Sequence, residues 1–161
     1  MDKSPFRFAS EAERTDPMQR ARRLQWFIQN SSTAIFAEKE IVQTAIENGL
    51  IDSASLLKPD LYNPRFSEEV ENEWVPSWYG KIVERAENES LVVLLFEIGD
   101  VLPDQTAMMY ILYHAKERCY HGTSDKLPDN VKVIIAVPSQ EQAEKIENRE
   151  MKMIMSYCVR I

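Results

Sequence analysis

Two apolar runs, separated by a helical pattern, most constrain the fold of this chain. Residues 91–96 have the sequence LVVLLF, and residues 131–137 contain a single polar residue. Short runs without polar alternation are typical of parallel strands buried on both faces. Between them, residues 103–118 place Ala107, Ile111 and Ala115 on one stripe of a helix. This alternation of strand and helix predicts an α/β fold with a mainly parallel sheet.

Weaker patterns predict the remaining elements. Asp16 followed by Pro17 indicates the start of a helix, because aspartate caps helix ends and proline is tolerated in the first turn. We expect this helix to extend to residue 30, and Gly49 to end a second helix over residues 38–48. Further helices are predicted over residues 77–86 and 140–148, and further strands over residues 33–37 and 153–161. Residues 52–77 show no regular pattern.

The size and charge of the chain limit its organisation and its partners. For 161 residues, we expect a flexible arm over residues 1–15 and a single domain over residues 16–161. The formal net charge of −7 opposes binding to nucleic acid or to an anionic membrane surface. No apolar segment has the length of a membrane span or the place of a secretory signal, so we expect a cytoplasmic protein. Cys119 and Cys158 fit that compartment as free thiols.

Glycine is scarce in this sequence. Its four glycines are Gly49, Gly80, Gly99 and Gly122, and no two of them lie close together. Loops that cradle phosphate groups need several residues with unusual backbone angles near the oxyanion. The sequence therefore excludes a glycine-rich phosphate-binding loop.

Four segments, in a fixed order, resemble the nucleotide-binding core of AAA+ ATPases of the MoxR-like branch. Residues 91–104 are similar to a Walker B strand and the start of the helix behind it, and residues 127–136 to the sensor 1 strand. Residues 74–79 are similar to the segment before Walker B, and Lys39 lies where the family has its phosphate-loop lysine. The resemblance covers residues 33–161. It implies a three-layer, P-loop-NTPase-like core.

Carried over position by position, the resemblance implies that the phosphate and metal ligands are missing. Glu40 replaces the hydroxyl that binds magnesium, and Phe96 replaces the Walker B aspartate. Glu38 and Glu40 flank Lys39 where phosphates would bind, and their charge opposes an anion. Glu97 matches the catalytic glutamate but has no metal-bound nucleotide to act on.

The remaining catalytic positions of the family are also replaced. Pro138 lies at the position of the sensor 1 asparagine. Ser156 lies near the position of the arginine finger, although Arg149 or Arg160 is an alternative in that register. No helical lid domain follows the core in these residues. We therefore expect no nucleotide or other cofactor, no metal and no enzymatic activity.

The pattern of losses favours a pseudo-ATPase that serves as a protein-binding module. The expected partner is a genuine AAA+ ATPase or its client, with the chain acting as a decoy or an inhibitor. The candidate partner-binding residues are Trp74, Trp78 and Tyr79, because aromatic residues concentrate binding energy at interfaces. Acidic residues flank them, which favours a basic partner: Glu68, Glu69, Glu71 and Glu73. The alternative is that the tryptophans cap the core under a loop.

Two other classes of function stay open. An enzyme of unrelated type would use Lys39, Glu97 and His114 in one cleft. Each has a structural alternative: a solvated lysine, a carboxylate paired with a neighbouring base, and a histidine at a helix end. A nucleic-acid-binding protein would use a basic face of the first helix, formed by Arg20, Arg22 and Arg23.

Two smaller patterns have simple interpretations. His114, Cys119 and His121 are possible metal ligands, but no second ligand pair at a suitable spacing accompanies them, so a structured helix end is favoured. Ser139 stands near Glu141 without a neighbouring histidine, which predicts a helix cap rather than an activated nucleophile.

Overall fold

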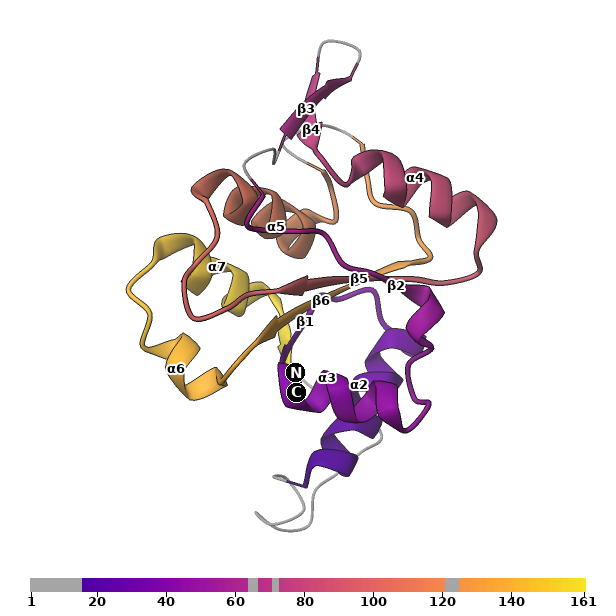
Figure 1. Cartoon of the computed structure of the whole chain (residues 1–161), viewed down its shortest axis with the longest axis vertical. Helices are drawn as coiled ribbons and strands as arrows, with labels where there is room; N and C mark the ends of the chain where they lie inside the picture. The colour runs from indigo at the N-terminus through magenta and orange to yellow at the C-terminus, as the bar shows by residue number, and fades with distance from the viewer. Residues whose placement is uncertain (1–15, 64–66, 71–72, 121–124) are drawn as a thin grey trace.

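A computed structural model describes residues 16–63, 67–70, 73–120 and 125–161 of the chain. Its centre is a five-stranded parallel sheet with the strand order β2-β5-β6-β1-β7. The strands are β1 (Ile35–Glu38), β2 (Leu56–Leu57), β5 (Val92–Glu97), β6 (Val131–Val137) and β7 (Val159–Arg160). Helices flank the sheet on both faces (Figure 1). The predicted α/β fold with a parallel sheet is confirmed, whereas the arm predicted over residues 1–15 lies outside the described residues.

The two apolar runs form the neighbouring strands β5 and β6 near the middle of the sheet, as predicted. Phe96 pairs with Ile135 across these strands. Successive side chains of a strand point to opposite faces, so Phe96 joins the core on one face and Leu95 the core on the other. Because helices cover both faces, neither strand needs a polar side.

Among the described residues, five helices cover the two faces of the sheet, and a sixth lies at the carboxyl ends of the strands (Figure 1). One face holds α2 (Pro17–Asn30) and α3 (Lys39–Glu47), and the other holds α4 (Tyr79–Asn88), α5 (Gln105–Glu117) and α7 (Arg149–Tyr157). The short α6 (Gln140–Glu144) follows β6 directly. Gly49 ends α3 with a φ of 70°, as predicted. Within the described ranges, no helix has the length and apolar character that crossing a bilayer requires.

The last part of the described chain differs from the prediction. We expect a strand over residues 153–161, but the structure has helix α7 up to Tyr157 and only a short strand after it. The side chain of Asn148 accepts a hydrogen bond from the Met151 backbone N–H at 2.9 Å and so caps the helix. Met151, Ile154 and Met155 are buried at helical spacing. An apolar run of this length fits either element, so its pattern alone does not separate them.

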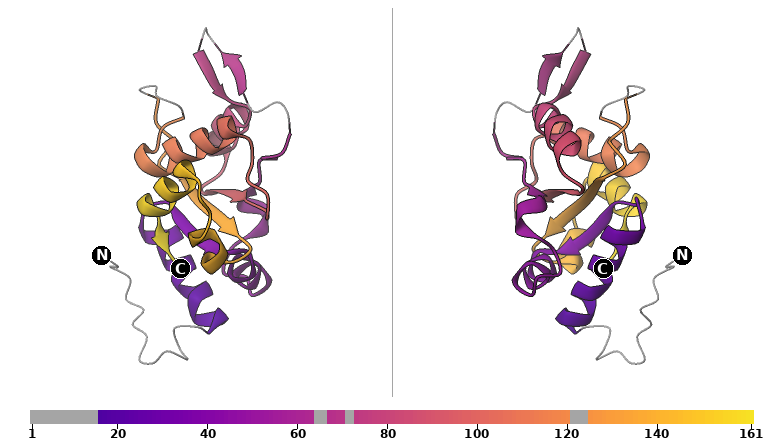
Figure 2. Two further views of the ribbon diagram at one scale, coloured as in Figure 1. Left: turned by 90° about the vertical axis from the view of Figure 1, so that its left-hand side faces the viewer. Right: turned by 90° about the vertical axis from the view of Figure 1, so that its right-hand side faces the viewer.

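The described part of residues 52–77, for which no regular structure is predicted, contains four elements. A 3-10 turn (Ser53–Ser55) leads into the edge strand β2. The strands β3 (Ser67–Val70) and β4 (Glu73–Pro76) form an antiparallel hairpin that is separate from the main sheet. The hairpin projects beyond the helices (Figure 2). Its mostly polar sequence hides the strand pattern, because little of it packs against the core.

Candidate functional site at the carboxyl ends of the strands

Strands β1 and β6 lie side by side, yet the chain leaves them toward opposite faces of the sheet. β1 continues into α3 on one face, whereas β6 leads through α6 to α7 on the other. In open parallel sheets, ligands bind in the crevice that such a divergence leaves outside the carboxyl ends of the strands. We call this edge of β1 and β6 the strand-end crevice.

Residues that resemble parts of a nucleotide site meet at the strand-end crevice. Glu38 pairs with Val137, which places Lys39 and Pro138 directly beyond the ends of β1 and β6. Glu97 is the last residue of β5, on the far side of β6. Lys39, Pro138 and Glu97, which the resemblance groups together, therefore lie in one region of the fold.

The chain passes from β1 to α3 without a loop. β1 ends at Glu38 and α3 begins at Lys39, so Lys39 and Glu40 lie in the first turn of the helix. Lys39 is half-buried and Glu40 is exposed. A loop that wraps around phosphate groups needs residues between strand and helix, and here there are none. The backbone at this position has no room for such a cradle.

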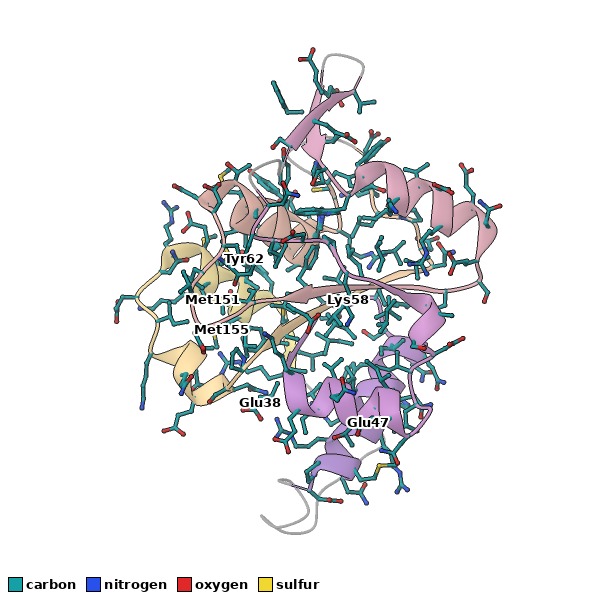
Figure 3. The ribbon with its side chains drawn as sticks, viewed as in Figure 1. Glu38, Glu47, Lys58, Tyr62, Met151 and Met155 are labelled. Atoms are coloured by element: carbon teal, nitrogen blue, oxygen red, sulfur yellow. The ribbon has the colours of Figure 1, made fainter. Side chains whose placement is uncertain are left out.

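Glu38 lies at the strand-end crevice (Figure 3), where hydrogen bonds and an ion pair hold its carboxylate. One oxygen pairs with Arg20 at 3.0 Å, and the other accepts a hydrogen bond from the Gln140 backbone N–H at 3.0 Å. The Arg20 guanidinium and the Gln140 side chain both donate to the carbonyl oxygen of Ile161, at 2.8 and 2.6 Å. These contacts join α2, β1 and α6 to one another and to Ile161, the residue after β7.

The position of Glu38 bears directly on ligand binding. Backbone N–H groups at the start of a helix attract anions, and at this crevice the Gln140 N–H already binds the Glu38 carboxylate. A phosphate group here would displace that contact and would meet a fixed negative charge. The crevice is thus occupied by a carboxylate of the chain itself.

A small cavity of about 170 Å³ lies beside the crevice, at the ends of β5 and β6. Apolar side chains form most of its wall, among them Ile98, Val137, Ile146 and Met151. Sites for small molecules usually enclose about 300–1,000 Å³, so this cavity is too small for a nucleotide. Tyr62 fixes the loop on one side: its hydroxyl donates to the Val101 carbonyl at 2.6 Å and accepts from the Gly99 N–H at 2.8 Å.

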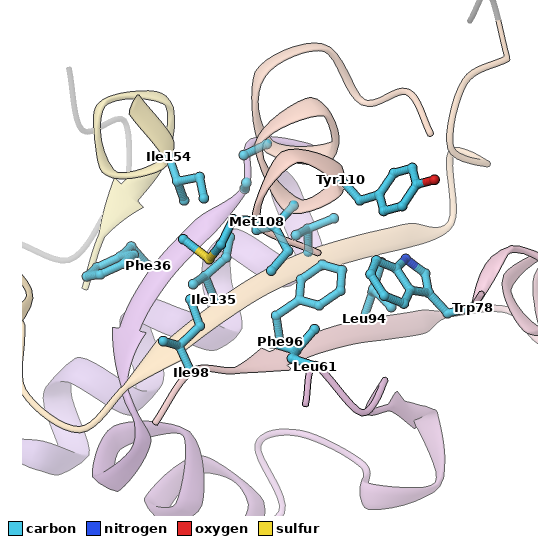
Figure 4. Close-up of a cluster of buried hydrophobic side chains, with 14 of the residues drawn as sticks. Phe36, Leu61, Trp78, Leu94, Phe96, Ile98, Met108, Tyr110, Ile135 and Ile154 are labelled. Carbon is cyan, nitrogen blue, oxygen red and sulfur yellow. The ribbon is translucent and has the colours of Figure 1, made fainter. Parts of the chain in front are cut away.

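Phe96 lies in the core and not at the crevice (Figure 4). Its side chain is fully buried, and its ring centre lies 5.4 Å from Trp78 and 5.7 Å from His114. An aromatic ring in this environment offers no ligand to a metal ion. Glu97, the next residue, is half-exposed and pairs with Lys58 at 3.5 Å. The structural interpretation of Glu97, a carboxylate paired with a neighbouring base, is confirmed.

His114 is fully buried and both of its ring nitrogens are engaged. Nδ1 donates to the Cys119 carbonyl at 2.8 Å, and Nε2 accepts from the Trp78 indole N–H at 3.0 Å. Burial lowers the pKa of His114 from 6.5 to about 4, so the ring is neutral. Among the described residues, no group of three metal-ligating side chains gathers. His121 lies outside them, and His114 serves as the structured helix end favoured by the sequence.

The three aromatic residues predicted to bind a partner have different environments. Trp74 is 58% exposed, on the hairpin. Trp78 is only 4% exposed and lies in the core, which corrects its assignment to a binding surface. Tyr79 is half-buried and packs edge-on against Tyr120 at 4.6 Å. The structural alternative therefore describes Trp78, whereas Trp74 alone has the exposure that the binding hypothesis needs.

The three arginines of the first helix do not form an open basic face. Arg20 binds Glu38, and Arg23 donates to the Arg160 carbonyl at 2.5 Å. Both side chains therefore point toward the core of the molecule, and Arg22 is exposed. This arrangement removes most of the basic surface on which nucleic-acid binding was expected to depend.

The residues proposed for an unrelated enzyme do not gather in one cleft, and the lysine whose pKa is shifted lies elsewhere. Burial lowers the pKa of Lys132, whose ammonium group donates to the Ser31 carbonyl at 2.7 Å. Lys132 lies near the start of β6, at the end of the strand opposite the crevice. His114, the third residue proposed for such an enzyme, is sealed in the core. The three residues of that hypothesis are thus not combined in one cleft.

The remaining sequence-predicted positions are structural. The Ser139 hydroxyl accepts from the Gln142 N–H at 3.3 Å, so the predicted helix cap is confirmed. Ser156 donates to the Met153 carbonyl at 2.7 Å within α7, and Arg160 pairs with Glu144 at 2.7 Å. Cys119 is buried and Cys158 is half-buried, both as free thiols.

Sequence reasoning missed the residues that close the crevice. Arg20 was grouped with a basic helix face and Gln140 with a helix start, although both contact the network around Glu38. Tyr62 was not singled out, because it lies in a segment without a regular pattern. The only available signal was the position of Glu38, an acidic residue at the end of an apolar strand.

In comparisons with known proteins, no protein-family model matches this chain, and no curated protein matches it.

Proposed function

We propose that this chain is a catalytically inactive, AAA+-like core that serves as a protein-binding module. One observation carries the proposal: the Glu38 carboxylate lies in the strand-end crevice, bound to Arg20 and to the Gln140 N–H. In a nucleotide-binding core this is where phosphate groups would lie. A pre-formed ion pair there opposes the binding of an anion.

The arrangement of the other matched positions supports the same proposal. Segments that resemble the phosphate loop, Walker B and sensor 1 end at neighbouring strands, as a nucleotide site would require. Phosphoryl transfer also needs a metal ligand and a phosphate cradle. Phe96 places an apolar ring where the metal ligand would be. The chain passes directly from Glu38 in β1 to Lys39 in α3, which leaves no room for a phosphate cradle. The fold is compatible with descent from an ATPase, but the residues at these positions do not support ATP hydrolysis.

The proposed partner is a genuine AAA+ ATPase or a client of one. A core that keeps the shape of an ATPase subunit without its chemistry can occupy a subunit's place and block turnover. The chain would then act as a decoy or an inhibitor.

Phosphate release from Mg-ATP tests both parts of the proposal in one assay. The chain alone should release no phosphate above a protein-free control, and Glu97→Gln should change nothing, because Glu97 has no nucleotide to act on. Added to a MoxR-like ATPase from the same host, the chain should lower the rate of release as its concentration rises. Turnover by the chain alone that Glu97→Gln abolishes would contradict the inactive core. An unchanged rate of the ATPase would contradict the inhibitor role.

A further inference from the structure

The β3–β4 hairpin is a projecting element with an anchored base. Val75 of β4 is 4% exposed and belongs to the core. The hydroxyl groups of Ser67 and Tyr110 lie 2.7 Å apart and form a hydrogen bond between the hairpin and α5. A two-stranded hairpin by itself is marginally stable in water, so these contacts hold the hairpin in place. Its outer part extends away from the sheet and the helices (Figure 2).

The outer part of the hairpin presents an aromatic ring beside a carboxylate. Trp74 is 58% exposed, which is a large exposure for an indole ring. Glu69 lies directly opposite Trp74 in the antiparallel register. Directly opposed residues point to the same face of the hairpin, with Cβ atoms about 4.5–5.5 Å apart. The indole and the carboxylate are therefore neighbours on one exposed surface.

The charge of the hairpin has a single sign. The described strands carry Glu68, Glu69 and Glu73 and contain no lysine or arginine. Among the described residues, none of these three carboxylates has an ion-pair partner within 4.0 Å. By contrast, two exposed carboxylates of α6 have such a partner, Glu141 with Lys145 and Glu144 with Arg160. The surface around Trp74 thus attracts cations.

We propose that Glu69 and Trp74 form a docking site for a basic segment of a partner protein. An arginine or lysine side chain of the partner lies against the indole of Trp74, and its charge pairs with Glu69. Cations bind the faces of tryptophan rings, and arginine suits both the flat ring and the planar carboxylate. Glu68 and Glu73 increase the rate of encounter. The inference deepens the proposed function, on which it rests, by naming the chemistry of the protein partner.

A short labelled peptide of alternating arginine and valine serves as the probe, with fluorescence anisotropy to measure its affinity. The wild-type chain should bind this peptide, and the same peptide with glutamate in place of arginine should not bind. Trp74→Ala should weaken binding about fivefold or more, as expected for the loss of a cation–π contact and its ring surface. Glu69→Gln should weaken binding less and should reduce its dependence on salt. In nuclear magnetic resonance spectra, the indole N–H signal of Trp74 should shift on binding, and that of buried Trp78 should not.

Tyr157→Ala is the matched control, because Tyr157 is an exposed aromatic residue on α7 at 38% exposure. It should bind the peptide like the wild type. Trp74→Ala should keep its melting temperature, since the lost ring is mostly exposed. The proposal is overturned if the wild type ignores the basic peptide, if it binds both peptides equally, or if Trp74→Ala and Glu69→Gln bind like Tyr157→Ala. Such a result, combined with no phosphate release by the chain alone, would remove the hairpin site and leave the inactive core standing.

Discussion

His114 lies among aromatic rings in the core, with Trp78, Phe96 and Tyr120 around it at ring-centre distances of 5.7–6.1 Å. Burial lowers the pKa of His114, and the positive charge of Arg118 lowers it further. The neutral ring satisfies the Trp78 N–H and the Cys119 carbonyl, whereas a protonated ring would leave the Trp78 N–H without an acceptor. The fold is therefore built around the neutral form of one histidine.

The stability of the protein should consequently fall in mild acid. The pKa of His114 is about 4 in the folded chain and 6.5 when exposed, so the unfolded chain binds the proton more readily between these values. The stabilisation is complete above pH 6.5, declines as the pH falls, and is lost near pH 4. Between pH 7 and pH 5 this group should account for about 2 kcal/mol of lost unfolding free energy. Urea unfolding at both values measures the loss.

His114→Gln provides the control for this prediction. The amide can still donate and accept hydrogen bonds, but it does not titrate. The variant should be less stable than the wild type at pH 7 and should lose less stability on acidification. Equal losses in the two proteins would show that another group causes the acid sensitivity.

At the scale of elements, β5, which resembles a Walker B strand in sequence, is a core strand of the sheet. Its burial is continuous from Val92 to Phe96, and only Glu97 reaches the half-exposed edge. Phe96 packs under α4 and α5 through Trp78 and His114. The position that resembles a metal ligand thus stabilises the attachment of two helices to the sheet.

Phe96→Asp, which introduces the aspartate that AAA+ ATPases have in the strand that β5 resembles, should therefore destabilise the fold and produce no activity. Replacing a buried ring by an unpaired carboxylate should cost about 3–5 kcal/mol of unfolding free energy. Phe96→Leu should cost less, because it leaves an apolar side chain. Thermal unfolding of the three proteins measures the order. A melting temperature of Phe96→Asp equal to that of the wild type would show that the strand is not buried as described.

The sequence identifies elements well where burial imposes one pattern. The bounds of β6 match the predicted residues 131–137, because both of its faces are covered and every position but one is apolar. The prediction of a strand over residues 153–161 is wrong for the second half of α7, because the apolar residues there fit both periods. The cap that Asn148 provides is a weak signal in the sequence. The hairpin was missed because Glu68 and Glu69 interrupt any alternation of apolar residues.

At the scale of the whole molecule, the candidate site depends on contacts between distant segments. The resemblance to AAA+ ATPases pointed to Lys39 and Glu97, which lie at the carboxyl ends of β1 and β5. It did not identify the pairing of Arg20 with Glu38 or of Gln140 with Glu38, which depends on how helices pack at the strand ends. It also did not separate buried Trp78 from exposed Trp74, which are four residues apart in one segment. Burial is a property of the assembled fold.

Calorimetric titration of the chain with Mg-ATP tests the central claim most directly. If the Glu38 carboxylate occupies the strand-end crevice, the titration should show no saturable heat at millimolar ATP. At that concentration, even a binding free energy of about −4 kcal/mol would be detected. A saturable isotherm with a dissociation constant in the low micromolar range would contradict this account, because it would require a working phosphate site where the chain places its own carboxylate.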